Sequence, residues 1–338
     1  MPELLEVTDL RVDFPTDDGV VHAVRGVSYT LAPGEVLGIV GESGSGKSVT
    51  SMALIGLLPA SARIRGSVKF RGEELVGRKP SELQRFRGSK IAMIFQDPMT
   101  SLNPVYTIGW QLSEALLAHN DISKKEAWNR AVEMLDLVGI PQAKDRANSY
   151  PHEFSGGMRQ RAMIAMAVCN DPDIIIADEP TTALDVTVQA QILETLETIK
   201  LQTQAAIILI THDLGVVAGM VDKMLVMYAG TVVESGTVDD VFYAPRMPYT
   251  VGLLGSLPSV ETSGAPLTPI RGAPPSLINL PPGCPFSPRC PLVQEDCLRN
   301  EPDLDVTETV EHQAACLHWQ QLASLDDPRV LFTAGSEV

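Results

Sequence analysis

The sequence predicts an α/β fold, and three observations lead to that prediction. An apolar run at 36–40 is followed by a glycine-rich stretch at 41–48 and then by apolar residues at helical spacing. A second apolar run, at 174–177, ends in two adjacent carboxylates. The segment between these runs, from about 98 to 165, is rich in helix signals, so we expect a helical insertion between two halves of one core.

The glycine-rich stretch reads GESGSGKS, from Gly41 to Ser48, and fits the pattern G-x-x-x-x-G-K-[ST] at every fixed position. Its small residues leave the backbone free to wrap around phosphate oxygens, and the N–H groups at the start of the following helix point at an anion. Lys47 would then reach the β- and γ-phosphates, and Ser48 would ligate Mg²⁺. The alternative is a Gly/Ser turn that matches by chance, and the strand–helix context argues against it.

Short strands are expected from residue 3 to about 40, because apolar residues alternate roughly and turn residues interrupt them at 15–19 and 32–34. A further strand is expected at 64–70, and together these segments predict a small antiparallel sheet. Phe14 lies upstream of the phosphate-binding loop and could stack on an adenine base. Taken by itself, an aromatic residue in a strand more often packs into the core.

The insertion carries recognisable helix starts. The strand expected at 90–95 is followed at once by Gln96. Thr107 could cap a first helix, and Ser123 with Glu126 forms a capping box that opens a second. Further along, Ser155, Gly156 and Gly157 make a small-residue start to an Ala/Met-rich helix, where backbone N–H groups could hold phosphate. Taken alone, that start could equally be an ordinary helix cap.

The apolar run at 174–177 delivers Asp178 and Glu179. An Asp at the tip of a buried strand is placed to hold Mg²⁺, usually through water, and an adjacent Glu can polarise a water for attack on a γ-phosphate. The alternative is a pair of solvated carboxylates. His212 follows another buried strand at 206–210, in a position where a histidine is usually a surface residue.

The charge balance restricts the partners of this chain. It has 42 acidic and 26 basic residues among 338 and a net charge of −16, which argues against non-specific binding to nucleic acid or anionic lipid. No apolar run approaches the length needed to span a bilayer, and the N-terminus does not resemble a signal peptide. We therefore expect a cytoplasmic chain without direct membrane insertion, whose association with a membrane comes through a protein partner.

These motifs, in this order and spacing, resemble the ATP-binding subunits of ABC transporters over residues 3–255. The resemblance implies a P-loop NTPase fold of the ABC type, with a mixed core sheet, an antiparallel β subdomain and a helical subdomain at about 98–165. The matching motifs are the Walker A loop at 41–48, the Q-loop at Gln96, the signature at 155–157, Walker B at 174–178, the D-loop at 182–185 and the switch histidine at His212. The signature departs from many members of the family at Met158, where they have Gln.

The resemblance also implies roles for single residues. Catalytic roles fall to Glu179 as the base, His212, Lys47 and Gln96. Mg²⁺ would be held by Ser48, Gln96 and Asp178. ATP contacts are expected from Phe14, Gly41, Ser43, Gly44, Ser45, Gly46, Lys47, Ser48 and Val49 and, in a partner's site, from Ser155, Gly156, Gly157 and Asp185. The family arrangement is head-to-tail, so this single ATPase domain is expected to pair with a second, similar subunit.

A narrower resemblance is to the dipeptide/oligopeptide importers, and within them to the first of two paired ATPase subunits. It rests on the segments 95–104, 227–230 and 247–250 and on the tail around 271–291. It implies that the chain energises peptide import beneath two membrane permeases, on the cytoplasmic side of the membrane, with an extracytoplasmic binding protein supplying the peptide. The alternatives are an ATPase of a related importer for nickel or another small solute, and a soluble ABC ATPase outside transport.

From 256 to 338 the chain reads as a Pro- and Cys-rich C-terminal extension. Four of the five cysteines lie there, at Cys284, Cys290, Cys297 and Cys316, whereas Cys169 is expected to be a small buried residue on a helix. A reducing compartment disfavours disulfides. Zinc is possible, but the tight C-x₂-C turns of zinc ribbons are absent, while a [4Fe–4S] cluster needs four thiolates and tolerates wider spacing. The importer resemblance, whose tails carry this cysteine pattern, favours the [4Fe–4S] cluster over zinc and over plain thiols.

Overall fold

A computed structural model describes residues 3–182, 184–256 and 270–332. Ala183 of the predicted D-loop, the start of the predicted extension at 257–269 and residues 333–338 lie outside this description. The chain forms two compact units. Unit 1 comprises Met1–Leu4, Leu31–Val36 and Gly77–Ile210, and unit 2 comprises Leu5–Thr30, Leu37–Val76 and Thr211–Val338.

The centre of unit 1 is a parallel array of three strands, β6 (Ile91–Ile94), β7 (Ile174–Asp178) and β8 (Ala206–Thr211). Residue 174 pairs with residues 91 and 206 on its two sides. Every residue of β7 and β8 is buried, which explains why both strands are almost continuously apolar rather than alternating. The carboxyl ends of β7 and β8 therefore carry the first polar groups after each apolar run.

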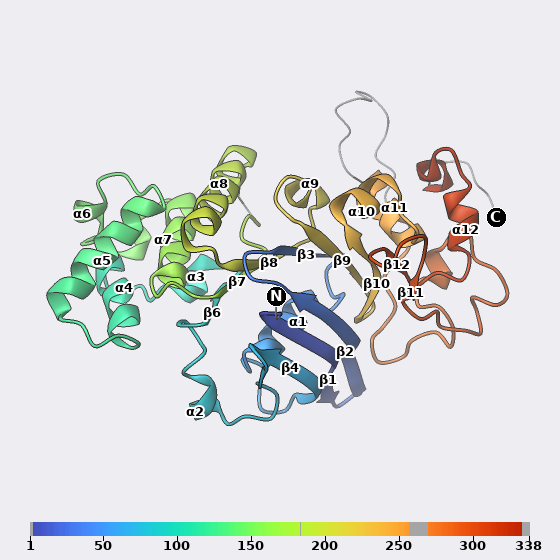
Figure 1. The fold of residues 1–338 in the computed structure, drawn as a ribbon, viewed down its shortest axis with the longest axis horizontal. Coiled ribbons are helices and arrows are strands. Elements are labelled where there is room, and N and C mark those ends of the chain that lie inside the picture. The colour runs from blue at the N-terminus through green and yellow to red at the C-terminus, as the bar shows by residue number, and fades with distance from the viewer. Residues whose placement is uncertain (1–2, 183, 257–269, 333–338) are drawn as a thin grey trace. The chain divides into compact units, whose positions relative to one another are not determined.

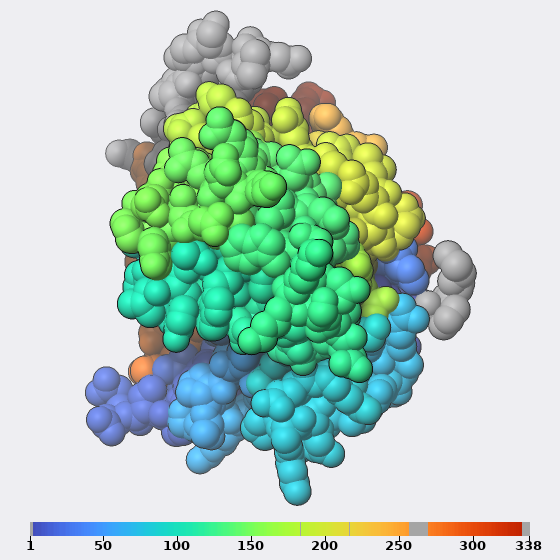
Figure 2. All heavy atoms as spheres, turned by 90° about the vertical axis from the view of Figure 1, so that its left-hand side faces the viewer, coloured from blue at the N-terminus to red at the C-terminus, as the bar shows by residue number. Residues whose placement is uncertain are grey.

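Helices make up most of the rest of unit 1, and two of them begin at the caps that the sequence predicts. Thr107 caps one helix by accepting a hydrogen bond from the Trp110 N–H group, and Ser123 and Glu126 form the expected capping box. Figure 2 turns these green helices toward the viewer. The helical segments of unit 1 are α2 (Pro80–Leu83), α3 (Pro98–Ser101), α4 (Ile108–Leu117), α5 (Lys124–Leu137), α6 (Ala143–Arg146), η1 (Pro151–Glu153), α7 (Gly156–Val168) and α8 (Val186–Thr203).

Unit 2 contains a four-stranded sheet in the order β2-β1-β4-β5 (Figure 1). Its strands are β1 (Leu5–Thr16), β2 (Gly19–Leu31), β4 (Arg63–Phe70) and β5 (Glu73–Glu74). β1 and β4 are antiparallel, as the sequence predicts. The sequence predicts several short strands where β1 runs on without a break. The strand β1 continues past this point through a β-bulge. The pairing register shifts between Thr8 and Arg11, and Asp9 adopts a φ of 45°.

The second set of strands in unit 2 includes part of the C-terminal extension. These strands are β3 (Val36–Val40), β9 (Lys223–Tyr228), β10 (Thr231–Thr237), β11 (Asp305–Val306) and β12 (Gln313–Ala314). β3 is parallel to β9, while β9, β10, β12 and β11 follow one another in antiparallel pairs. The helical segments of unit 2 are α1 (Lys47–Leu54), α9 (Leu214–Val217), α10 (Val238–Tyr243), α11 (Pro248–Gly255), η2 (Ser287–Arg289), α12 (Trp319–Ala323) and η3 (Pro328–Phe332). Among the described residues, no helix is both long and apolar enough to span a membrane.

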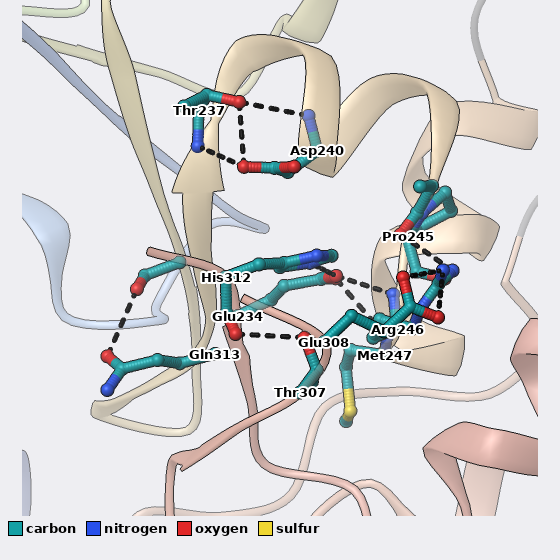
Figure 3. A network of polar contacts seen from close by, with 12 residues as sticks. Glu234, Thr237, Asp240, Pro245, Arg246, Met247, Thr307, Glu308, His312 and Gln313 are labelled. Carbon is teal, nitrogen blue, oxygen red and sulfur yellow. Dashed lines mark hydrogen bonds and ion pairs between the residues drawn. The ribbon is translucent and has the colours of Figure 1, made fainter. Parts of the chain in front are cut away.

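A buried carboxylate fastens the extension to the rest of unit 2 (Figure 3). Glu234 on β10 is fully buried and accepts hydrogen bonds from the backbone N–H groups of Arg246, at 2.5 Å, and Met247, at 3.3 Å. His312 of the extension places its Nε2 atom 2.9 Å from the same carboxylate. Arg246 in turn pairs with Glu308 of the extension at 3.0 Å. One acidic side chain thus joins β10, the segment before α11 and the turn before β12.

Candidate functional site

The glycine-rich loop 41–48 has a backbone that only glycine fits at its first position. Gly41 adopts a φ of 149°, and a Cβ atom there would lie 2.2 Å from the Met227 carbonyl oxygen. The loop passes directly into α1, where the Thr50 N–H group donates to the Gly46 carbonyl at 2.9 Å. The loop therefore lies between β3 and a helix N-terminus, as the sequence predicts, and a helix N-terminus favours an anion.

Two polar side chains of the loop are buried and suited to phosphate. The Lys47 ammonium group donates to the carbonyl oxygens of Gly41 and Glu42, at 2.7 and 2.9 Å, so it lies across the loop. The Ser45 hydroxyl is buried without a hydrogen-bond partner in the described part of the chain. An unsatisfied buried hydroxyl is costly, and a phosphate oxygen would satisfy it. The donor set thus fits a nucleotide's phosphates.

In unit 1, the carboxylate after β7 is held by two side chains. Gln96 donates from its amide to the Glu179 carboxylate at 2.8 Å, and the Thr182 hydroxyl donates to the same oxygen at 2.8 Å. Glu179 itself adopts a φ of 47°, and its N–H group bonds to the Ile210 carbonyl at 2.9 Å. A non-glycine residue in this conformation is strained, and such strain concentrates at functional sites. Asp178, one residue earlier, is buried at the end of the strand.

Two further predicted nucleotide contacts, Phe14 and His212, lie in unit 2. Phe14 is half-buried on β1, and His212 is exposed just after β8. Beside Phe14, the Asp13 carboxylate is held by His22 at 2.7 Å and by Arg65 at 2.5 Å, which fixes this end of β1. Both Phe14 and His212 belong to unit 2, together with loop 41–48, whereas Gln96, Asp178 and Glu179 belong to unit 1.

The residues predicted to act on a partner's nucleotide lie at two helix starts in unit 1. Ser155 caps α7 by accepting a hydrogen bond from the Met158 N–H group, and Ser155 and Gly156 are exposed. Asp185 caps α8 by accepting one from the Val188 N–H group at 3.0 Å. Val186, beside it, is 81% exposed. Both helix starts are therefore open to another molecule.

The four cysteines of the extension line one small cavity of about 20 Å³ in unit 2. Gly283 allows this arrangement, because a Cβ atom there would lie 2.2 Å from the Cys297 carbonyl oxygen. The next residue, Cys284, donates its N–H group to that carbonyl at 2.8 Å. Cys290 follows η2 and Cys316 follows β12, so four separate turns deliver the thiols. The fifth, Cys169, is buried at the end of α7, as predicted.

The cysteine cavity is apolar, and this affects the thiols. Burial raises the pKa of Cys290 and of Cys316 to about 12 and also raises that of Cys284. Without a cation, these thiols stay protonated at neutral pH, since burial disfavours the charged form. Four sulfur ligands in a dry cavity form a donor set suited to a soft metal centre.

One contact in unit 2 has no counterpart in the sequence prediction. Arg289, between two of the cysteines, forms an ion pair with Glu42 in the second position of loop 41–48. The sequence offers one signal, an arginine set between Cys284 and Cys290. That signal gives no indication of a partner 247 positions away.

Comparison with known proteins matches residues 24–182 to the family described as ABC transporter. It matches residues 233–297 to the oligopeptide/dipeptide transporter C-terminal region. The oligopeptide transport ATP-binding protein OppD of Salmonella typhimurium is 57% identical over 302 residues, covering 89% of this chain and 90% of the relative. The dipeptide transport ATP-binding protein DppD of Bacillus subtilis is 55% identical over 304 residues, covering 89% and 91%.

Another relative is much longer. OppD of Mycobacterium tuberculosis is 57% identical over 319 residues, which is 94% of this chain but 52% of the relative, so this chain spans about half its length. Among solved structures, the ATP-binding cassette MJ0796, a dimer in a post-hydrolysis state bound to ADP and phosphate, is 26% identical with a TM-score of 0.63. That match covers 69% of this chain and 98% of the cassette. The protein cbiO1 of Clostridium perfringens is 27% identical with a TM-score of 0.61, covering 72% and 92%.

Proposed function

The chain belongs to the ABC transporter family, and from that premise we propose that it is the ATP-hydrolysing subunit of an importer for dipeptides or oligopeptides. The names and the high identity of the OppD and DppD relatives support this proposal. The observation in this structure that carries it is the strained Glu179, held by Gln96 and Thr182 at the end of a buried strand. A carboxylate fixed in this way is suited to orient a water molecule.

The proposed reaction is in-line attack of water on the γ-phosphate of MgATP. Lys47 and the N–H groups of its loop would neutralise the phosphates, and Ser48, Asp178 and Gln96 would hold Mg²⁺ and its waters. Glu179 accepts the proton of the attacking water. His212 contacts the γ-phosphate, and Phe14 stacks on the adenine. The match of these residues to the family motifs supports these roles.

A second ATPase subunit completes the proposed site. The exposed Ser155, Gly156 and Asp185, beside the exposed Val186, support this part of the proposal, because all four lie at helix starts open to another molecule. The cassette MJ0796 was solved as a dimer. We place Ser155–Gly157 and Asp185 against the nucleotide of a similar partner subunit, which the importer group supplies as a separate chain.

The helical region of unit 1 carries the surface that we assign to the permeases. Val105 is 69% exposed and Met99 59%, and the rings of Tyr106 and Trp110 stack with centroids 3.9 Å apart while remaining partly exposed. Exposed apolar side chains gathered in one segment mark an interaction site. Two membrane permeases would cover this segment and hold the chain on the cytoplasmic side of the membrane. An extracytoplasmic binding protein would deliver the peptide.

For the four cysteines, we assign a [4Fe–4S] cluster, with zinc as the alternative. The shared lining of one cavity by the four cysteines and their importer-type pattern support the cluster. The Cys297 sulfur also lies within 4.8 Å of donor atoms of Asp296 and His318, so these two side chains are further potential ligands for either centre. Bound there, the cluster would supply a rigid cross-link among four turns.

The test of the proposed function uses Glu179→Gln in the assembled complex with both permeases and the second ATPase. ATP binding should persist, while hydrolysis should fall by about 10²- to 10⁴-fold because the general base is lost. Peptide uptake into vesicles should fall with it. Glu197→Gln, exposed on α8, is the matched control and should hydrolyse ATP normally. Unchanged hydrolysis in Glu179→Gln would show that Glu179 is not the general base. Uptake of nickel but not of peptides would show that the transported substrate is nickel.

A further inference from the structure

Arg289 joins the cysteine-bearing extension to the phosphate-binding loop. Its guanidinium donates two hydrogen bonds to the two carboxylate oxygens of Glu42, at 2.6 and 2.8 Å. The Arg289 side chain is only 4% exposed and that of Glu42 is 28% exposed. A forked, mostly buried Arg–carboxylate pair is both strong and geometrically specific. Glu42, the second residue of the loop, is therefore held in place by a side chain of the C-terminal extension.

Aromatic rings surround this ion pair. Tyr228, Tyr249 and Phe286 pack with ring centroids between 4.5 and 5.4 Å apart, and Arg289 lies over two of these rings. The Glu42 N–H group donates to the Tyr249 hydroxyl at 2.8 Å, and Arg289 donates to the Tyr228 hydroxyl at 3.3 Å. The Tyr249 hydroxyl thus fixes the backbone of Glu42, and Arg289 fixes its side chain.

Glu42 also contacts the lysine that we assign to the phosphates. The Glu42 carbonyl accepts a hydrogen bond from the Lys47 ammonium group at 2.9 Å, and one from the Ser45 N–H group at 3.2 Å. Any shift of Glu42 therefore moves an acceptor of the Lys47 ammonium group. The Glu42 carboxylate is, moreover, a negative charge beside a site for negative phosphates, and Arg289 neutralises it.

The base of Arg289 lies in a closed turn between two cysteines. The Ser287 N–H group donates to the Cys284 carbonyl at 2.9 Å, and the Arg289 N–H group to the Phe286 carbonyl at 2.9 Å. Cys290 comes directly after Arg289 and lines the cysteine cavity. Whatever the four thiols hold will therefore fix both ends of the turn that carries Arg289.

We propose that Arg289 is a positioning residue for MgATP, through which the cysteine pocket of the extension sets the geometry and charge of the phosphate-binding loop. The proposal rests on the proposed ATPase function and deepens it. It makes the extension part of the nucleotide site's support, acting through the single ion pair with Glu42.

The first test measures equilibrium binding of a fluorescent ATP analogue with Mg²⁺ to the full chain, together with hydrolysis by the complex. Arg289→Ala leaves the Glu42 carboxylate unpaired beside the phosphates, so Kd should rise by about 10- to 100-fold. Arg289→Lys keeps the positive charge but cannot form the two parallel hydrogen bonds, so its Kd should lie between those of the wild type and Arg289→Ala. Arg289→Ala combined with Glu42→Gln removes the unpaired charge and should recover most of the affinity. If Arg289 only stabilised the fold, adding Glu42→Gln would not restore nucleotide affinity.

The control is Glu301→Gln, which weakens another contact between the extension and the rest of unit 2, the ion pair with Arg25. It should leave nucleotide affinity unchanged, because that pair does not touch the loop. Wild-type affinity in Arg289→Ala, with only a lowered melting temperature, would overturn the proposal. So would equal losses in Arg289→Ala and in its double variant with Glu42→Gln. If the wild-type chain binds no MgATP, the proposed function itself fails, which is a distinguishable result.

A second test addresses the cysteines without relying on hydrolysis. Cys290→Ser should raise the Kd for the same nucleotide in the wild-type background and should have no further effect in Arg289→Ala. Hydrogen exchange of the amides in loop 41–48 should quicken in both single variants. Additive effects of Cys290→Ser and Arg289→Ala would show that the pocket does not act through this arginine.

Discussion

The phosphate-binding loop and the cysteine pocket both depend on a glycine that lets two backbone segments approach closely. At Gly41 and at Gly283, a Cβ atom would lie 2.2 Å from a carbonyl oxygen, of Met227 and Cys297 respectively. The loop's other groups lie within eight consecutive residues, whereas the pocket collects its thiols from four turns between 284 and 316. A continuous segment fixes the first site, and the crossing of separate segments fixes the second. The pocket should therefore be the more sensitive of the two to distant changes.

The largest expected effect concerns the content of the pocket. With the proposed [4Fe–4S] cluster in the pocket, Cys290→Ser would remove one of its four thiolates, so iron and sulfide in anaerobically purified protein should fall from about four of each per chain to near zero. Elemental analysis and visible absorption measure this. Cys169→Ala, which removes the buried cysteine outside the pocket, is the control and should keep the full content.

Two outcomes would change the assignment. Wild-type protein that carries about one zinc per chain and no iron would establish zinc in place of the cluster. Equal metal content in Cys290→Ser and the wild type would show that the cavity lined by the four cysteines is not the metal site.

The next largest effects distinguish the roles of Gly41 and Gly283. Gly41→Ala should weaken MgATP binding by about 10- to 100-fold, since overpacking at such a contact costs about 1–3 kcal/mol and the φ of 149° adds strain. Its iron content should be normal. Gly283→Ala should instead lower iron content, because Cys284 can no longer approach Cys297. Gly44→Ala is a useful control for strain alone, since a Cβ atom there meets nothing within 4 Å. Nucleotide binding and metal content should be measured on all three variants. Loss of iron with normal nucleotide binding in Gly41→Ala would contradict the assignment of the two glycines to two separate sites.

The smallest of these effects tests what holds the pocket's segments in place. Glu234→Ala leaves two buried backbone N–H groups and His312 without their acceptor, so the free energy of unfolding should fall by about 1–3 kcal/mol. Glu308→Ala removes only a partly exposed ion pair and should cost less than about 1 kcal/mol. Denaturant unfolding of both variants measures the difference. Equal losses would mean that the buried carboxylate does not fasten the extension more firmly than a surface pair.

Much of the nucleotide machinery could be predicted from the sequence, because each motif is local. The loop 41–48, the strand ending at Asp178 and the capped helices at Thr107 and Ser123 all lie where expected. Each of these features is determined by residues within a few positions of one another. The single long β1 was not predicted, because its bulge at Asp9 looks like a strand end in the sequence.

Contacts across long separations could not be predicted in the same way. Nothing near Glu42 indicates that its carboxylate meets Arg289, and nothing near Glu234 indicates that His312 will reach it. The spacing of the cysteines suggested a shared site but not the crossing at Gly283 that brings two of them together. These features depend on which segments pack side by side, and that is decided by the whole of unit 2.

The pairing of β12 with β10 has a consequence for how this chain is made. Before residues 313–314 are synthesised, β10 presents an outer edge of unpaired N–H and C=O groups, which is a template for pairing with another chain. The extension covers that edge and leaves in its place the two-residue β11, which is short and begins with an acidic residue. The outer edge of β10 is thus covered by a segment that is synthesised well after β10 itself. A fragment that stops at residue 255 would keep the motifs for ATP and lose the protection of its own sheet.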